Sequence, residues 1–262
     1  MKPTTSRWVA AMWPPIIPLV VVVLLLEWTV RAGWVPSYLV PPPSRVAATL
    51  LSSKDGAELL RAASTTTLAA LAGFALSAIV GTLVAIALSS ARWVQRAFYP
   101  YAIFFQTVPI IAIAPLLVIW IGFDIRTVIA SAFIVSVFPV IANTLTGLLS
   151  TDPALRDLFR LYGASHAASL LKLRLPFALP SMMTGLRVAG GLAVIGAIVG
   201  EFITGSGLGG VISIAITQQR VDKIFAGLIL AAVLGICLFG LVNLASWIVL
   251  RNWHASEKGE SR

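Results

Sequence analysis

Long apolar runs alternate with short polar segments along the whole chain. A helix needs about 20 mostly apolar residues to cross the hydrocarbon core of a bilayer, and six runs reach that length. They lie at about 13–33, 65–90, 98–121, 127–149, 183–203 and 226–250. The pattern predicts an all-α membrane protein with six transmembrane helices. These form a single transmembrane domain, 13–250, between tails at 1–12 and 251–262.

Composition and charge support the same class. Hydrophobic residues make up 58% of the chain and charged residues 11%, whereas soluble domains are about 45–50% apolar and about 25% charged. The net charge of +9 is spread in short clusters between the apolar runs, unlike the basic patch of a nucleic-acid-binding protein. Cytoplasmic loops of membrane proteins carry excess Lys and Arg. Placing both termini in the cytoplasm puts twelve of the 19 basic residues inside and seven outside.

The first apolar run has the charged start of a signal peptide. No small-x-small cleavage site follows it before Arg31, however. We therefore expect this run to be retained as the first span of a multi-pass inner-membrane protein.

Three ionisable residues fall at or near membrane depth: Glu27, Arg187 and Glu201. Charges there are costly and usually face a bundle interior or a water-filled cavity. All three are candidates for a gate or a structural ion pair, and Glu201 is the best of them, since Glu27 and Arg187 are close enough to span ends to reach the interface. The glycine-rich GSGLGG, 205–210, follows a span rather than a strand, so we interpret it as a tight turn and not as a nucleotide-binding motif.

The segment 151–180 differs from the rest because it is amphipathic and basic. Asp152 and Pro153 supply a helix start, and Gly163 supplies a joint. A second amphipathic piece is expected at 164–173, ended by Pro176 and Pro180. In the first piece, apolar residues at helical spacing share one face: Leu155, Leu158, Phe159 and Tyr162.

Two interpretations of this segment stay open from its physical chemistry alone. It can lie on anionic lipid through its apolar face and its basic residues, or it can dock on a soluble partner. Catalysis is not expected, because no HExxH, CxxC or GxSxG pattern occurs. We predict no metal site either.

The spacing within 151–180 resembles a known loop. Membrane subunits of bacterial ABC importers carry the pattern E-A-A-x3-G-x9-I-x-L-P. Here Asp157-Leu158-Phe159 is followed after three residues by Gly163 and after nine more by Leu173-x-Leu175-Pro176. Glycine, leucine and proline are kept, whereas Asp replaces Glu, Leu replaces Ile, and Leu-Phe replaces Ala-Ala.

The resemblance extends over roughly residues 25–250. The matching stretches are VPPPSRV (40–46), PIIAIAPLLVIWIGF (109–123), FPVIANTLTGL (138–148), LPSMMTGLRVAGGLAVIGAIVGEF (179–202) and GSGLGGVI (205–212). Together they are similar to the nitrate/sulfonate/taurine-type permeases of ABC importers.

This resemblance implies a type I importer permease bundle that works as a dimer, with a homodimer expected. Two ATPase subunits would bind ATP and Mg²⁺, and an extracytoplasmic binding protein would deliver a small solute. The chain itself would bind no cofactor. The segment 151–180 would be the coupling loop, through residues Asp157, Phe159, Tyr162, Gly163, Leu173 and Pro176. A stand-alone carrier or channel and a non-transporting membrane scaffold are the alternatives.

Overall fold

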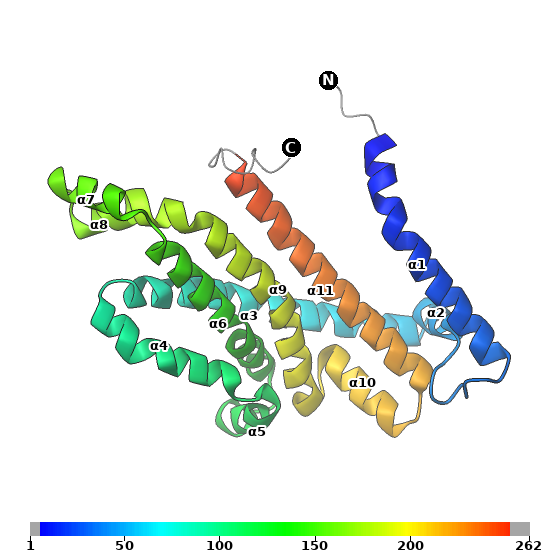
Figure 1. Ribbon diagram of the computed structural model, residues 1–262. Helices are drawn as coiled ribbons and strands as arrows, with labels where there is room; N and C mark the ends of the chain where they lie inside the picture. The colour runs from blue at the N-terminus through cyan, green and yellow to red at the C-terminus, as the bar shows by residue number, and fades with distance from the viewer. Residues whose placement is uncertain (1–5, 252–262) are drawn as a thin grey trace.

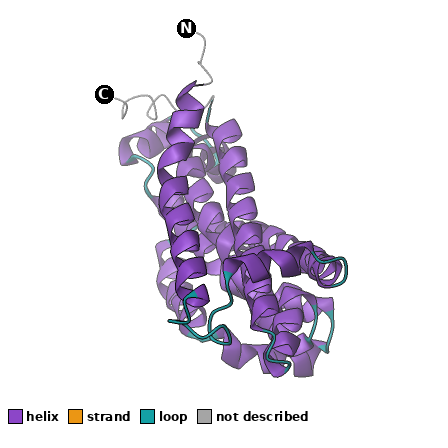
Figure 2. Cartoon of the chain, turned by 90° about the vertical axis from the view of Figure 1, so that its right-hand side faces the viewer, coloured by secondary structure: helices purple, strands orange, loops and turns teal. Residues whose placement is uncertain are grey.

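The apolar runs fold as helices, because a backbone in lipid must satisfy its hydrogen bonds internally. The computed structural model describes residues 6–251, which hold only helices and loops (Figures 1 and 2). The elements are α1 (Ser6–Arg31), α2 (Pro43–Leu51), α3 (Asp55–Leu88), α4 (Arg92–Thr107), α5 (Ile110–Ile121), α6 (Ile125–Leu149), α7 (Pro153–Leu161), α8 (His166–Ser169), the π-helical turn η1 (Leu170–Arg174), α9 (Leu175–Thr204), α10 (Gly207–Thr217) and α11 (Val221–Leu250). The all-α class is confirmed.

Four helices are long and apolar enough to cross a membrane within the described part of the chain. They are α3, α6, the continuous run His166–Thr204 and α11. The first expected span corresponds to α1, which begins at Ser6, so that residues 6–12 of the expected tail are helical. The remaining tail residues, 1–5 and 252–262, lie outside the described residues.

The third expected span, 98–121, is wrong as a single helix. The structure divides it into α4 and α5, joined at Val108 and Pro109. Proline removes a backbone donor and pushes the preceding residue into an extended conformation. Val108 accordingly has a ψ of 122°. Pro115 and Pro139, in contrast, stay inside α5 and α6.

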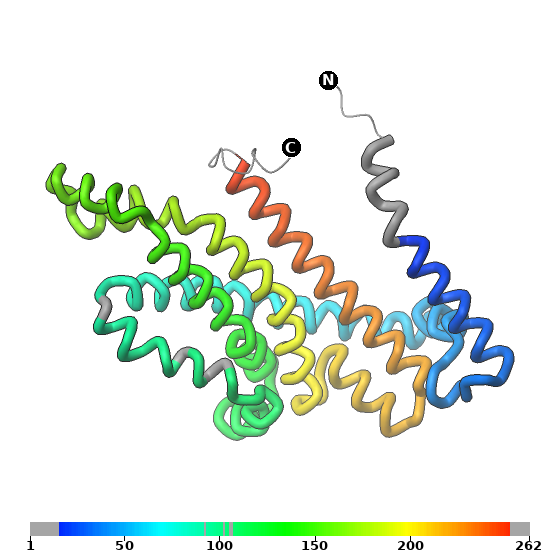
Figure 3. The backbone as a smooth tube through the Cα atoms, in the orientation of Figure 1, coloured from blue at the N-terminus to red at the C-terminus, as the bar shows by residue number. Residues whose placement is uncertain are grey.

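The expected end of the second amphipathic piece at Pro176 and Pro180 is also wrong. Helix continues from His166 through α9, as the tube in Figure 3 shows. Pro176 lies in the first turn of α9 and Pro180 inside it. In the π turn just before Pro176, the backbone hydrogen bonds span five residues instead of four. Leu175 N–H accordingly donates to Leu170 O. A single wide turn of this kind is often found at functional sites.

Small residues let α6 and α9 pack as the most extensive helix pair of the bundle. A Cβ atom on Gly196 would lie 2.7 Å from Ser131 O, and one on Gly185 would lie 2.8 Å from Pro139 O. Close backbone approach at small residues is the usual way that helices associate in lipid. α3 joins this pair through the buried hydrogen bond between Ser77 Oγ and Ser136 Oγ, 2.8 Å.

An ionic network closes the end of the bundle that carries α2 and α10. Arg220 donates to both carboxylate oxygens of Asp55, each at 3.0 Å, and to Asp222 Oδ2 at 2.8 Å. These bonds, first those to Asp55 and then that to Asp222, hold the pKa of the Arg220 guanidinium above its ordinary value. Lys223 Nζ reaches Glu58 at 2.8 Å. The network joins α3 to α11 at this end.

Candidate functional site: a projecting hairpin and a buried carboxylate

The segment that the sequence singles out forms a hairpin, residues 153–174, which we call the projecting hairpin. In Figure 1, α7 and α8 lie together at one end of the molecule, far from α10. Asp152 begins α7 by accepting the Ala154 N–H at 2.8 Å, and Pro153 occupies the first turn. No residue of α7 is buried, so this helix is presented to its surroundings rather than packed into the bundle.

Gly163 makes the sharp turn at the end of α7. Its φ of +68° lies in the left-handed region that glycine adopts at little cost. Ala164 N–H donates to Phe159 O and Gly163 N–H donates to Arg160 O, both at 2.9 Å. This pair of bonds is a Schellman motif, which satisfies the last carbonyls of a helix. The chain therefore reverses at a defined angle without a long loop.

The tip of the projecting hairpin is apolar and exposed. Leu161 is 85% exposed and Tyr162 83%. Asp157 is exposed too and pairs with Arg160 at 3.3 Å. Phe159 is half-buried and faces a cavity behind α7, so it does not share the tip with Tyr162. Leu161 was missed by sequence reasoning because it lies off the helical face that Leu155 and Tyr162 define.

The other two expected coupling residues lie where the hairpin rejoins the bundle. Leu173 belongs to η1 and Pro176 to the first turn of α9, and both are half-buried. The expected residues thus divide into two groups. Four of them belong to α7 and its turn, namely Asp157, Phe159, Tyr162 and Gly163, whereas Leu173 and Pro176 belong to the base of the hairpin.

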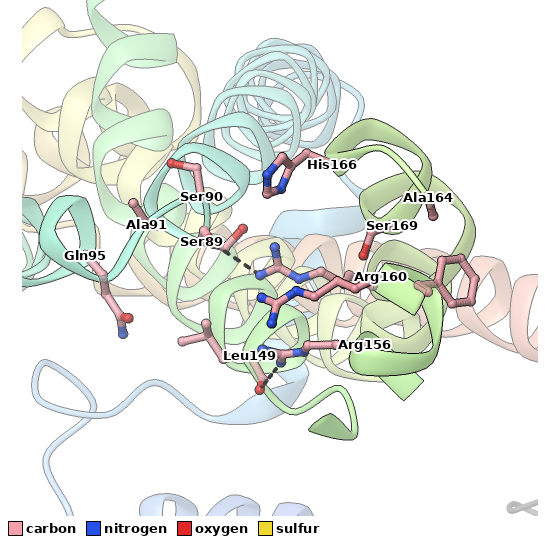
Figure 4. A pocket seen from close by; sticks show the side chains of 12 residues that line it. Ser89, Ser90, Ala91, Gln95, Leu149, Arg156, Arg160, Ala164, His166 and Ser169 are labelled. Atoms are coloured by element: carbon pink, nitrogen blue, oxygen red, sulfur yellow. Dashed lines mark hydrogen bonds between the residues drawn. The ribbon is translucent and has the colours of Figure 1, made fainter. Parts of the chain in front are cut away.

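Two arginines brace the hairpin against the ends of the bundle helices (Figure 4). Arg156 Nη2 donates to Leu149 O at 2.7 Å, at the last residue of α6. Arg174 Nη2 donates to Ser89 O at 3.2 Å, at the end of α3. Cations at helix C-termini are stabilised by the helix dipole. Arg156 thus ties α7 to the end of α6, and Arg174 ties the base of the hairpin to the end of α3.

Glu201 is enclosed by the glycine-rich turn that follows it. Its side chain is fully buried, and Oε2 accepts from Thr66 Oγ1 at 3.0 Å and from Gly209 N–H at 2.9 Å. A Cβ on Gly207 would lie within contact distance of Oε1, and one on Gly209 would meet Ile198 O at 2.6 Å. The GSGLGG stretch is therefore a close-fitting cradle for this carboxyl, which agrees with the expected tight turn.

The three membrane-depth ionisable residues do not meet. Within the described chain no basic side chain forms a salt bridge with Glu201. Arg187 donates instead to Ser246 Oγ, which links α9 to α11. Glu27 pairs with Arg31 at 2.6 Å and accepts Ser44 N–H at 2.9 Å, so it ties the end of α1 to the start of α2.

Glu201→Ala should lower stability by about 2–3 kcal/mol, because it leaves the Gly209 N–H buried without an acceptor. Glu201→Gln keeps an amide oxygen for both hydrogen bonds but puts its NH2 group at the buried Oε1 position, which has no partner within the described chain, so it should cost about 1–2 kcal/mol, less than the alanine variant. Thermal unfolding of the two variants in the same detergent tests this. If the glutamine variant is as unstable as the alanine variant, the two hydrogen bonds to Oε2 are not what the carboxyl contributes to stability.

The fold is that of a multi-span membrane protein with an exposed helical hairpin outside the bundle. Residues 73–247 match the family described as the binding-protein-dependent transport system inner membrane component. The chain belongs to this family, and it is a permease component of an ABC importer. Membership favours this function over a stand-alone carrier and over a scaffold.

Three curated relatives support the assignment. A probable ABC transporter permease of Haemophilus influenzae is 36% identical over 89% of this chain and 94% of its own. A formylaminopyrimidine transport permease of Halalkalibacterium halodurans is 33% identical over 87% and 91%. A putative aliphatic sulfonates transport permease of Bacillus subtilis is 29% identical over 90% and 87%.

A solved structure shares the fold. An inward-facing MetNI methionine ABC transporter contains a chain that matches with a TM-score of 0.66 and 18% identity. The match covers 78% of this chain and all of the other. At this identity the match concerns the architecture, and it agrees with a type I importer bundle.

Proposed function

We propose that this chain lines half of the translocation pathway of an ATP-driven importer, with a second copy of itself supplying the other half. Two ATPase subunits dock on the projecting hairpins and bind ATP and Mg²⁺, which this chain does not. The observation that carries the proposal is the exposed apolar tip, Leu161 and Tyr162, at the end of a helix that has no fully buried residue.

The orientation follows from the docking. If ATPase subunits contact the projecting hairpin, the hairpin lies in the cytoplasm. α9 leaves from the hairpin and α11 is the next long span, so the end of α11 returns to the same side. An even number of spans places the N-terminus there too, which agrees with the surplus of Lys and Arg on that side. The α2 and α10 end then faces the extracytoplasmic binding protein.

The transported substrate is a small solute. Relatives are named for a formylaminopyrimidine and for aliphatic sulfonates, which are small polar molecules. We propose a substrate of this size class, delivered by the binding protein and passed along the pathway between the two permease copies.

In the proposed coupling, α7 acts as a lever. Asp157, Tyr162 and Gly163 form the docking end, with Phe159 behind it, and Leu173 and Pro176 form the rigid base. Closure of the ATPase dimer moves α7, and Arg156 and Arg174 pass the movement to α6 and α3 through the bonds described above. Driving such a two-state element from 1:99 to 99:1 takes about 5.5 kcal/mol, which a floppy lever could not transmit.

Co-purification tests this function. The chain is purified in mild detergent as the parent, as the double variant Leu161→Glu/Tyr162→Glu and as the conservative control Tyr162→Phe. Two carboxylates on exposed side chains leave the bundle intact but prevent burial of the tip. We expect an ABC ATPase, identified by mass spectrometry and by ATP hydrolysis, with the parent and the control, and at least about tenfold less with the double variant.

Two results would contradict the proposal. One is an equal yield of ATPase with the double variant, which would mean that the hairpin lies on lipid. The other is a parent that purifies without ATPase from cells that express the ATPase. Equal amounts of all three chains in the membrane fraction are the control for folding.

A further inference from the structure

A basic cavity of about 390 Å³ lies between the projecting hairpin and the turn that joins α3 to α4. Figure 4 shows Arg156 and Arg160 on one side of it, with Ser89 and Ser90 opposite. Arg174 and His166 also line it, and among the described residues that form its wall none is acidic. A cavity with this much positive charge requires an explanation beyond ordinary packing.

Two of the guanidinium groups converge on one oxygen atom. Leu148 O accepts from Arg156 Nη2 at 3.5 Å and from Arg174 Nε at 3.3 Å. Both side chains are half-buried, and their bonds in the described chain are to carbonyl oxygens only. Like charges held this close repel each other in a medium of reduced dielectric constant. A counter-charge between them would relieve the repulsion.

Helix capping offsets only part of this charge. The ends of α3 and α6 each contribute roughly half a negative charge, against a full positive charge on each of Arg156 and Arg174. A surplus of about one charge therefore remains, even if Asp157 fully neutralises Arg160. A bound anion would balance this surplus positive charge.

Further polar groups line the same space. His166 adds an imidazole at the mouth of the cavity. The rim also includes Ala91 and Gln95 of the α4 N-terminus, where no side chain caps the first turn. Planar guanidinium groups beside free backbone N–H groups match the tetrahedral oxygens of phosphate.

The cavity lies at the ends of two helices that can span a membrane, where lipid headgroups would be within reach. α3 and α6 are both long enough to cross the bilayer, and the cavity is at the ends of both. Trp93, in the first turn of α4, is 70% exposed, as is typical of indole rings at the interface between lipid and water. Basic pockets between spanning helices at this depth suit lipid headgroups.

We propose that the basic cavity binds a phosphate-class oxyanion, either the headgroup of an acidic phospholipid or free phosphate. The bound anion would join Arg156 and Arg160 of α7 to Arg174 at the base of the hairpin and to the α3–α4 turn. It would thereby strengthen the connection between α7 and the bundle. This site is independent of which ATPase docks on the tip.

The test uses the full chain in detergent with two probes. Inorganic phosphate is titrated against sodium chloride at constant ionic strength, with thermal unfolding as the readout. Native mass spectrometry counts the acidic phospholipid retained by each chain. Saturable protection by phosphate of lipid-free protein identifies a free anion as a sufficient ligand. A retained acidic phospholipid that phosphate displaces identifies a headgroup. Both results support the proposal.

Matched variants locate the site. Arg174→Gln removes a cavity charge, and Lys172→Gln removes an exposed charge from the same turn that does not line the cavity. We expect Arg174→Gln to weaken phosphate binding or lipid retention at least about tenfold, through the loss of charge-assisted hydrogen bonds. Lys172→Gln should change it less than about twofold.

A second pair of variants tests the proposal even if the Arg174 variant misfolds. Ser90→Asp places a carboxylate at the cavity wall and keeps every arginine, whereas Ser90→Asn has the same size without the charge. We expect the aspartate variant to abolish the phosphate effect and the asparagine variant to keep it. Equal protection by chloride and phosphate, or equal loss in Lys172→Gln and Arg174→Gln, would overturn the proposal.

Discussion

Replacing Gly196 with leucine is expected to separate α6 from α9 and to destabilise the fold strongly, although leucine is a far better helix former than glycine. The Cβ alone would lie 2.7 Å from Ser131 O and 2.8 Å from Ala132 Cα. These are backbone atoms of α6, which cannot move aside without separating the two central helices. Overpacking of a close interface lowers stability by about 1–3 kcal/mol or more. Leucine adds four carbon atoms against a helix backbone, so we expect a cost at the upper end of this range.

The measurement is the fraction of chain that elutes as a single species from size-exclusion chromatography of detergent-solubilised membranes. Gly196→Ala should give an intermediate loss, because its one carbon atom already makes the clash. Gly191→Leu is the matched control, since it lies on the same helix and a Cβ there meets nothing within 4 Å. A Gly196→Leu chain that elutes like the Gly191→Leu chain would contradict the close packing of α9 against α6.

The approximate position of four of the six expected spans could be predicted, because hydropathy acts over about 20 residues and those runs correspond to the four helices that are long enough to cross a membrane. The break in the third expected span could not be predicted from hydropathy. Pro109, Pro115 and Pro139 all lie in apolar runs, yet only Pro109 ends a helix. A proline in lipid is tolerated when neighbouring helices or side chains satisfy the carbonyl that it frees. That condition depends on tertiary contacts, which periodicity does not contain.

The candidate site likewise has a part that depends on local sequence, which could be predicted, and a part that depends on tertiary contacts, which could not. The turn at Gly163 follows from local chemistry, and the structure shows the left-handed conformation that a glycine joint suggests. The cradle of Glu201 requires Thr66, which is 135 residues away along the chain. The basic cavity likewise joins the α3–α4 turn to the hairpin, 85 residues apart at the bond between Arg174 and Ser89. Contacts over such separations are fixed by how the helices pack, so a single sequence does not reveal them.

Gly163→Pro should uncouple the permease from its ATPase while leaving the spans in place. Proline fixes φ near −65°, whereas the native φ at this position is +68°. It also deletes the N–H that bonds to Arg160 O at 2.9 Å. The combined cost to the native turn is about 3 kcal/mol or more, which corresponds to about a hundredfold loss in affinity for a partner that requires this turn.

Gly163→Asn separates the conformation of the turn from the identity of glycine. Asparagine is the other residue that routinely adopts the left-handed conformation, and a side chain at Gly163 would meet nothing within 4 Å. The asparagine variant should therefore keep most of the ATPase and most of the transport in reconstituted vesicles. The proline variant should lose both, with equal membrane insertion and equal elution. If asparagine fails as completely as proline, the partner contacts this position directly, and the turn angle is not what couples the two subunits.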